Sequence, residues 1–372
     1  MKPNPLKRLE LLGQSIWLDY IRRDLFSSGK LRRLIDDDGL RGMTSNPSIF
    51  EKAIAESNIY DQHIRDIALK NNDVKEIYET LSQRDVQSAA DEFRSVYEKT
   101  DGKDGYVSLE VNPHLAHDTK GTLEEARRLW AALNRPNIFI KVPATSEGLP
   151  AIQQLISEGI NVNITLLFGL LRYRQVAEAY IAGLEARATQ GKPMKHIASV
   201  ASFFVSRIDA LVDSHLEKLI AQAGQKTDLA KIVHGQVATS SAKAAYQIYK
   251  EIFGSTRFKK LADKGARVQR LLWASTSTKN PDYSDVKYIE SLIGPETINT
   301  VPPETIDAYR DHGNPKSSLE KDVKEASWIM ERLPELGINI DKVAQQLEDE
   351  GVRKFNEPFD KLMEAITKKS SK

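Results

Sequence analysis

The sequence has no cysteine in 372 residues, which excludes disulfide bonds, thiolate metal ligands and cysteine nucleophiles. It also lacks a charge imbalance: 53 lysine and arginine residues against 52 aspartate and glutamate residues leave a net charge of +1. Such a chain has no general attraction for nucleic acid, so any anion must be recognised locally. No run of 18 apolar residues and no signal-peptide core is apparent, so we predict a cytoplasmic protein without membrane contact.

Two kinds of ligand motif are missing as well. No Gly-x-Gly-x-x-Gly or Gly-x4-Gly-Lys-Ser/Thr sequence follows any apolar segment, which argues against a nucleotide-binding sheet. His114 and His117 lie three residues apart in a loop-like stretch, but no third ligand has a recognisable spacing. We therefore predict no metal and no organic cofactor.

What the chain does contain is a lysine inside an apolar segment, Asn137-Ile-Phe-Ile-Lys141-Val-Pro143. The segment is typical of a short buried strand bounded by turn residues. Most lysines are solvated, so Lys141 could simply reach the surface from an edge strand. Alternatively, a buried amine whose pKa falls by some units becomes the nucleophile that Schiff-base chemistry requires.

Apolar segments alternate with helical periodicity along the chain, which predicts a parallel sheet. Eight strand candidates suggest a single (β/α)8 barrel over residues 1–372, with an open doubly wound sheet as the alternative. A capping-box pattern at 122–125 predicts a helix over 123–134, residues from about 318 predict a helical extension, and the basic tail 368–372 is expected to be disordered. The strands are expected at about 16–20, 40–44, 105–111, 137–142, 160–166, 196–202, 267–274 and 297–301.

Polar residues gather near the carboxyl ends of these strands, where barrel enzymes assemble their sites. Each has a simpler explanation when taken alone: Asn46 could cap a helix, Asn163 and Thr165 could bond one another, and Arg207 could be a surface residue. Their coincidence near the strand ends instead favours one shared site, with these candidate residues: Asp19, Asn46, Glu110, Lys141, Asn163, Thr165, Ser202, Arg207, Ser275 and Lys279.

The set is chemically coherent. Lys141 can attack a ketone, while Glu110 moves protons through a water held by Thr165. Asp19 fits the base that removes a hydroxyl proton during carbon–carbon cleavage. Asn46 and Asn163 could hold hydroxyl groups of a three-carbon enamine, and Arg207, Lys279 and Ser275 could bind a phosphate.

At this point the sequence closely resembles the transaldolase family, in its longer bacterial form, over nearly the whole chain. The resemblance rests on Trp17-Leu-Asp19, Thr44-Ser-Asn46-Pro-Ser48, Val107-Ser-Leu-Glu110-Val, Ile140-Lys141-Val-Pro-Ala-Thr145, Gly159-Ile-Asn-Val-Asn163-Ile-Thr165-Leu-Leu-Phe168 and Ser202-Phe-Phe-Val-Ser-Arg207. It implies a class I aldolase barrel that transfers dihydroxyacetone from fructose 6-phosphate or sedoheptulose 7-phosphate to erythrose 4-phosphate or glyceraldehyde 3-phosphate, in the non-oxidative pentose phosphate pathway.

The resemblance also implies that Ser202 contacts the dihydroxyacetone unit and that Phe204 lines its pocket. One stretch departs from the family: an Ala-Ser-x-Arg-Asn run is replaced by the longer Ala274-Ser275-Thr-Ser-Thr-Lys279-Asn280, so Lys279 stands where a phosphate arginine is usual. The longer segments 225–236 and 254–266 have no evident role, and the oligomeric state stays open.

Two rival functions remain. One is a fructose-6-phosphate aldolase-type lyase that releases dihydroxyacetone, although such enzymes carry tyrosine in place of Phe204 and glutamine in place of Glu110. The other is a barrel that binds sugar phosphates without catalysis, because a fold alone does not guarantee a function.

Overall fold

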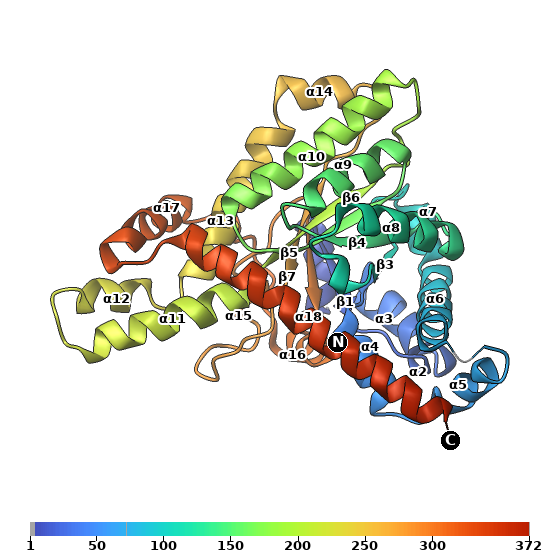
Figure 1. The fold of residues 1–372 in the computed structure, drawn as a ribbon. Coiled ribbons are helices and arrows are strands. Elements are labelled where there is room, and N and C mark those ends of the chain that lie inside the picture. Colours follow the sequence, from blue (N-terminus) through green and yellow to red (C-terminus); the bar gives the residue numbers. More distant parts are fainter. Residues whose placement is uncertain (1–3, 72, 372) are drawn as a thin grey trace.

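Eight parallel strands form the centre of the protein in this computed structural model, which describes residues 4–71 and 73–371. Each strand pairs with the next in sequence, and β8 pairs with β1 to close a barrel (Figure 1). This confirms the predicted (β/α)8 fold and rules out the open sheet. The strands are β1 (Gln14–Asp19), β2 (Gly42–Thr44), β3 (Tyr106–Glu110), β4 (Ile138–Pro143), β5 (Val162–Leu167), β6 (Ser199–Phe204), β7 (Arg270–Ala274) and β8 (Thr297–Val301).

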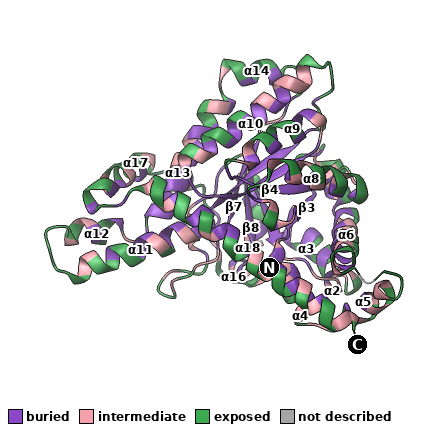
Figure 2. Cartoon of the chain, viewed as in Figure 1, coloured by how far each residue is buried: buried purple, intermediate pink, exposed green. Residues whose placement is uncertain are grey.

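Helices surround the barrel, and their buried faces pack on the strands (Figure 2). Within the described residues, none of these helices has both the length and the apolar character needed to cross a membrane. They are α1 (Pro5–Leu11), α2 (Asp24–Ser27), α3 (Lys30–Asp38), α4 (Pro47–Ala55), α5 (Asp61–Ala68), α6 (Val74–Glu92), α7 (Arg94–Lys99), η1 (Pro113–Leu115), α8 (Thr119–Leu133), α9 (Gly148–Glu158), α10 (Leu170–Thr189), α11 (Ser206–Ala221), α12 (Thr227–Val233), α13 (Val237–Phe253), α14 (Thr256–Ala262), α15 (Lys287–Glu290), α16 (Pro303–His312), α17 (Val323–Arg332), η2 (Leu333–Leu336) and α18 (Ile340–Ser370).

Aromatic side chains fill the amino-terminal end of the barrel. The ring of Phe139 stacks on Tyr106 at 4.3 Å and on Trp17 at 6.2 Å between centroids. Gly42 is required beside them, because a Cβ atom there would lie 2.5 Å from the indole of Trp17. A cavity lined by residues of the strand ends lies at the opposite, carboxyl end of the barrel, which is the usual location of sites in this fold.

The last helix, α18, runs across the carboxyl end of the barrel (Figure 1). It has 31 residues, which corresponds to about 46 Å at 1.5 Å per residue. It passes close over β5, since a Cβ atom on Gly351 would lie 2.9 Å from Leu166. The helix therefore covers part of the mouth into which the strand ends point.

The expected disorder of the basic tail is wrong for all but its final residue, Lys372, which lies outside the described part of the chain. Residues 368–370 belong to α18, and Lys369 Nζ donates to Ser57 O at 2.6 Å and to Asp61 Oδ1 at 2.7 Å. The charged end is ordered by contacts with Ser57 and Asp61, which are distant in the sequence and which local composition cannot predict.

The expected start of the helix predicted over 123–134 is also wrong. α8 begins at Thr119, because the side chain of Asp118 accepts a hydrogen bond from Gly121 N at 2.9 Å. Aspartate is a strong capping residue, so the pattern at Thr122 falls inside a helix that has already started.

Candidate active site

Lys141 lies on β4 and is only 5 % exposed. Its ammonium group donates to Ser45 O at 3.0 Å and lies 3.3 Å from Glu110 Oε2. The partnership follows from strand register, because Glu110 and Lys141 are directly paired residues of β3 and β4. As strand alternation predicts, Phe139 shares this inward face at the packed end of the barrel and Lys141 occupies it at the mouth.

Glu110 is the carboxylate nearest to the Lys141 amine. Burial raises the pKa of its carboxyl to about 6, an effect that the nearby charge of Lys141 opposes. Its carboxylate lies beside the lysine but does not line the cavity at the carboxyl end of the barrel, here called the main cavity of the site. It borders a smaller void together with Tyr78 and Phe359. Glu110 is therefore placed to exchange protons with Lys141 rather than to grip a substrate.

Asp19, at the end of β1, is the second carboxylate. Burial raises the pKa of Asp19, while Lys141 and a hydrogen bond from Thr44 act in the opposite direction. The Thr44 hydroxyl donates to Asp19 Oδ1 at 2.6 Å and itself lies 2.7 Å from the Thr300 hydroxyl. Unlike Glu110, Asp19 lines the main cavity.

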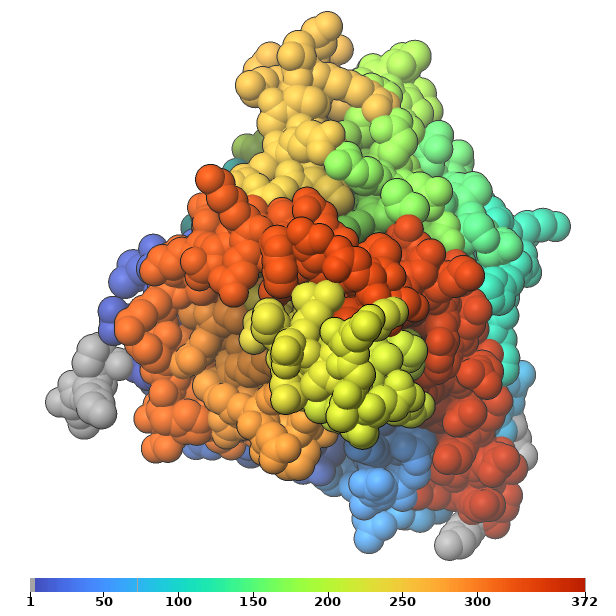
Figure 3. Space-filling model, turned by 90° about the vertical axis from the view of Figure 1, so that its left-hand side faces the viewer, coloured from blue at the N-terminus to red at the C-terminus, as the bar shows by residue number. Residues whose placement is uncertain are grey.

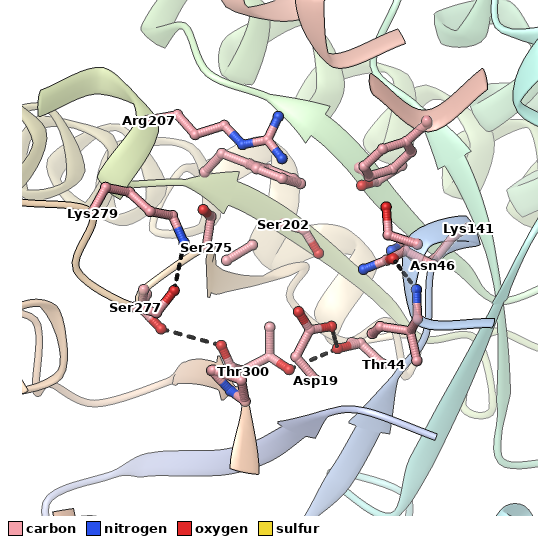
Figure 4. A pocket seen from close by; sticks show the side chains of 18 of the residues that line it. Asp19, Thr44, Asn46, Lys141, Ser202, Arg207, Ser275, Ser277, Lys279 and Thr300 are labelled. Carbon is pink, nitrogen blue, oxygen red and sulfur yellow. Dashed lines mark hydrogen bonds between the residues drawn. The ribbon is translucent and has the colours of Figure 1, made fainter. Parts of the chain in front are cut away.

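The main cavity has a volume of about 330 Å³. All but two of the residues predicted for the site line it: Asp19, Asn46, Lys141, Thr165, Ser202, Phe204, Arg207, Ser275 and Lys279. In Figure 4 Lys141 and Asn46 lie on one side of this pocket, while Arg207 and Lys279 lie together on the opposite side. The cavity thus has Lys141 at one end and a pair of cations, Arg207 and Lys279, at the other.

The two predicted residues that do not line the cavity are Glu110 and Asn163. Asn163 is fully buried, with Nδ2 donating to Ser108 Oγ at 3.0 Å and Oδ1 accepting from Ser202 Oγ at 2.6 Å. Both ends of its amide are therefore occupied within the barrel. Thr165 is not its partner, so the simpler explanation that these two residues bond one another is wrong.

Thr165 instead faces the cavity with an unused hydroxyl. Its Oγ1 atom is buried and finds no hydrogen-bond partner among the described residues. A buried hydroxyl without a partner is costly unless a water or ligand satisfies it. The position is adjacent to β4, because Thr165 pairs with Pro143, two residues beyond Lys141.

Asn46 caps a helix and also lies at the cavity, so its capping position does not remove it from the candidate site. Its side-chain oxygen accepts a hydrogen bond from Ile49 N at 3.0 Å and caps α4. The same side chain lines the cavity.

The cationic end of the cavity is formed by Arg207, on the first turn of α11, and Lys279, on the loop after β7. Burial lowers the pKa of Arg207, and burial together with the charge of Arg207 lowers the pKa of Lys279. Neither cation has a carboxylate within ion-pair distance in the described parts of the chain; Lys279 Nζ donates to Ser277 Oγ at 2.7 Å. This arrangement leaves positive charge free for an anionic ligand.

Several lining residues were missed from the sequence. Thr44 is the last residue of β2 and Thr300 the next-to-last residue of β8, so the rule that strand ends carry the site could have found them. Lys52 and Glu304 lie on the first helices after those strands. Phe355, whose ring centroid lies 6.0 Å from Lys141 Nζ, comes from α18 and has no local signal at all.

A (β/α)8 barrel with a lysine in its mouth, carboxylates beside it and cations across the cavity has the architecture of the class I aldolases, which form Schiff bases with carbonyl substrates. The chain belongs to the transaldolase/fructose-6-phosphate aldolase family, whose model matches residues 16–366. It is 50 % identical to a transaldolase of Trichodesmium erythraeum, over 100 % of this chain and 99 % of the relative. Identity is 48 % to transaldolase 2 of Nostoc punctiforme (99 % and 98 % covered) and 46 % to a transaldolase of Thiobacillus denitrificans (98 % and 99 %).

Proposed function

We propose that the protein is a transaldolase that moves a dihydroxyacetone unit from a ketose phosphate to an aldose phosphate. The donor is fructose 6-phosphate or sedoheptulose 7-phosphate, and the acceptor is glyceraldehyde 3-phosphate or erythrose 4-phosphate. The observation that carries the proposal is the buried Lys141, 3.3 Å from Glu110, at one end of a cavity whose other end is cationic. The names and full-length similarity of the relatives support the same reaction.

The first step is formation of a Schiff base at Lys141. The unprotonated amine attacks the ketone carbon of the donor and gives a carbinolamine, which loses water to form an iminium ion. Glu110 accepts the proton from the amine and returns one to the departing hydroxyl, through a water that the free hydroxyl of Thr165 holds. A carboxyl with a pKa of about 6 suits both directions of this transfer near neutral pH.

The second step is cleavage of the carbon–carbon bond beta to the iminium carbon. Asp19 removes the proton from the C4 hydroxyl, the C3–C4 bond breaks, and its electron pair neutralises the iminium as an enamine. The aldose phosphate leaves and the acceptor takes its place. The enamine then attacks the new aldehyde, Asp19 returns its proton to the resulting alkoxide, and water releases the product from Lys141.

Recognition divides between the two ends of the cavity. Asn46 and Ser202 contact the hydroxyl groups of the dihydroxyacetone unit, and Asn163 acts through Ser202, whose hydroxyl donates to its amide oxygen. Phe204 lines the wall, while Arg207, Lys279 and Ser275 bind the phosphate. The roughly opposite placement of Lys141 and the two cations suits a substrate with a carbonyl at one end and a phosphate at the other (Figure 4).

Two residues favour transfer over release of dihydroxyacetone. Phe204, unlike tyrosine, has no hydroxyl that could donate a proton to the enamine. Glu110, unlike glutamine, can accept a proton. Incubation with fructose 6-phosphate alone and with erythrose 4-phosphate separates the alternatives: rapid accumulation of free dihydroxyacetone without an acceptor would favour the lyase.

The lysine itself is tested by borohydride reduction in the presence of fructose 6-phosphate. We expect a dihydroxyacetone adduct on Lys141 by peptide mass spectrometry, and no adduct or turnover in Lys141→Ala. Lys243→Met is the matched control, because Lys243 is also buried but bonds to Lys321 O, outside the cavity. A folded wild-type protein without any adduct would support a barrel that only binds sugar phosphates.

We further propose that residues 1–372 form one domain in which 318–372 is an extension of the barrel, and that the enzyme acts in the cytoplasm. The contacts of α18 with the barrel and α4 support the first point. Doubly charged sugar phosphates do not diffuse through lipid, which supports the second. Truncation after residue 317 should then cost stability and activity together, and cell fractionation tests the location.

A further inference from the structure

The loop 275–286, between β7 and α15, carries Lys279 and is held at both ends. At its start, Thr276 Oγ1 donates to Asn299 Oδ1 at 2.8 Å and to Thr300 O at 3.2 Å. Between the ends, the side-chain hydrogen bonds are local, such as that from Asp282 N to Asn280 Oδ1. The position of Lys279 therefore depends on where the two ends of the loop are fixed.

The far end of the loop is fixed by Tyr283. Its hydroxyl donates to Asp213 Oδ2 at 2.7 Å and lies 3.2 Å from His234 Nδ1. The ammonium group of Lys287 lies 3.4 Å from the centroid of the same ring, within cation–π distance. The tyrosine is thus held by its hydroxyl and by its face.

Gly235 closes the pocket around this ring. Its amide donates to Asp213 Oδ1 at 2.8 Å, and its carbonyl accepts from Lys287 Nζ at 2.6 Å. Its φ of +70° favours glycine, and a Cβ atom there would lie 2.5 Å from the Tyr283 hydroxyl. Gly235 and His234 come from segment 225–236, which contains α12 and for which the sequence indicated no role.

The same pocket is tied to the other cation of the site. Arg207 and Asp213 both belong to α11, and Asp209 of this helix accepts from Tyr288 at 2.8 Å and lies 3.3 Å from Lys287 Nζ. Figure 3 shows the yellow surface of α11 and α12 directly beside the orange part of the chain that follows β7. Arg207 and the loop of Lys279 are therefore built on one connected unit.

We propose that the pocket formed by Asp213, His234, Gly235, Tyr283 and Lys287, here called the tyrosine anchor, positions Lys279 against Arg207 for phosphate binding. This inference rests on the proposed function, because it assigns the phosphate to those two cations. A lysine offers a point charge on a flexible stem, without the rigid fork of an arginine. Its backbone must then be placed accurately, and the tyrosine anchor, with segment 225–236 as one wall, does this.

The test is Tyr283→Phe, which removes both hydroxyl contacts and keeps the ring under Lys287. Inorganic phosphate is the probe, used as a competitive inhibitor and as a titrant in calorimetry. We expect phosphate affinity to fall and KM for erythrose 4-phosphate to rise, each by about three- to tenfold, with the loss in KM rather than in kcat. If Tyr283 had a purely structural role, Tyr283→Phe would lower thermal stability without raising KM more than it lowers kcat.

Tyr180→Phe is the matched control, because that tyrosine is buried and donates to Arg267 O at 2.7 Å away from the cavity. In a Lys279→Met background, Tyr283→Phe should have no further effect on phosphate affinity, since the two residues act through one contact. Additive losses would overturn the proposal. If Tyr283→Phe does not fold, His234→Ala removes one of the contacts and should give a smaller loss in the same direction.

The result also separates this inference from the proposed function. Unchanged phosphate affinity in folded Tyr283→Phe, measured by calorimetry, overturns the tyrosine anchor whether or not the wild-type protein is active. If Tyr283→Phe weakens phosphate binding as expected but the wild-type protein has no transfer activity, the proposed reaction is overturned and the tyrosine anchor is supported.

Discussion

Glu110 should impose an acidic limb on the rate of the reaction. Its pKa is raised to about 6 by burial, and the proposed step needs it ionised, as the acceptor of a proton from Lys141. A carboxyl with this pKa is about nine-tenths ionised at pH 7 and about one-tenth ionised at pH 5, so kcat/KM should fall about tenfold over that interval. At the ordinary value of 4.5, the same interval would cost only about 1.3-fold.

The assay must separate Glu110 from the substrate, because a phosphate monoester also changes charge near pH 6. We therefore follow transfer from fructose to erythrose, which carry no phosphate, by mass spectrometry of the sedoheptulose formed. The acidic limb should persist with these sugars. In Glu110→Gln the remaining rate should be about 10²- to 10⁴-fold lower and should lose the limb, because an amide cannot accept the proton.

Two results would refute this reasoning. A phosphate-free rate that is flat between pH 7 and pH 5 would show that ionised Glu110 is not required. An acidic limb that remains in Glu110→Gln would come from the ionisation of another group. Asp19 is the next candidate, since burial raises the pKa of Asp19 as well.

Three further perturbations test other contacts. Thr44→Val removes the 2.6 Å hydrogen bond that opposes the rise in the pKa of Asp19, so less of this carboxyl is ionised and kcat should fall about tenfold, as steady-state kinetics at pH 7 can show. Phe355→Ala opens the cavity above Lys141, so product analysis without an acceptor should detect more free dihydroxyacetone than in the wild type. Lys369→Met removes the bonds from α18 to Ser57 and Asp61, and urea unfolding should show a loss of about 1 kcal/mol with activity retained at low temperature.

Strand identity was predictable because eight apolar segments alternate with stretches of helical periodicity along the chain. The boundaries were less accurate: 196–202 was expected where β6 is Ser199–Phe204. Ile197 is apolar and buried, but its amide bonds to Met194 O in a turn and not to a neighbouring strand. Apolar composition thus reports burial, and burial extends beyond the paired residues of a strand.

Strand parity predicts which face a side chain occupies, but not how deep in the barrel it lies. Asn163 and Thr165 share the inward face of β5. The amide of Asn163 is hydrogen-bonded to Ser108 and Ser202, whereas the hydroxyl of Thr165 has no partner among the described residues and lies at the cavity. The difference comes from the register of β5 with β4 and β6, which depends on closure of the whole barrel. The position of Phe355 could not be predicted from the sequence either, because its place over Lys141 depends on where α18 crosses the barrel.

The two carboxylates near Lys141 differ in the surroundings that decide their chemistry. Glu110 pairs with the lysine across β3 and β4 and lies outside the main cavity, so it can exchange protons with the amine without contacting the departing aldose. Asp19 lines the cavity, where a substrate hydroxyl can reach it, and Thr44 offsets part of the cost of its burial. A single lysine can therefore form the Schiff base and support cleavage because two different strands provide its two bases.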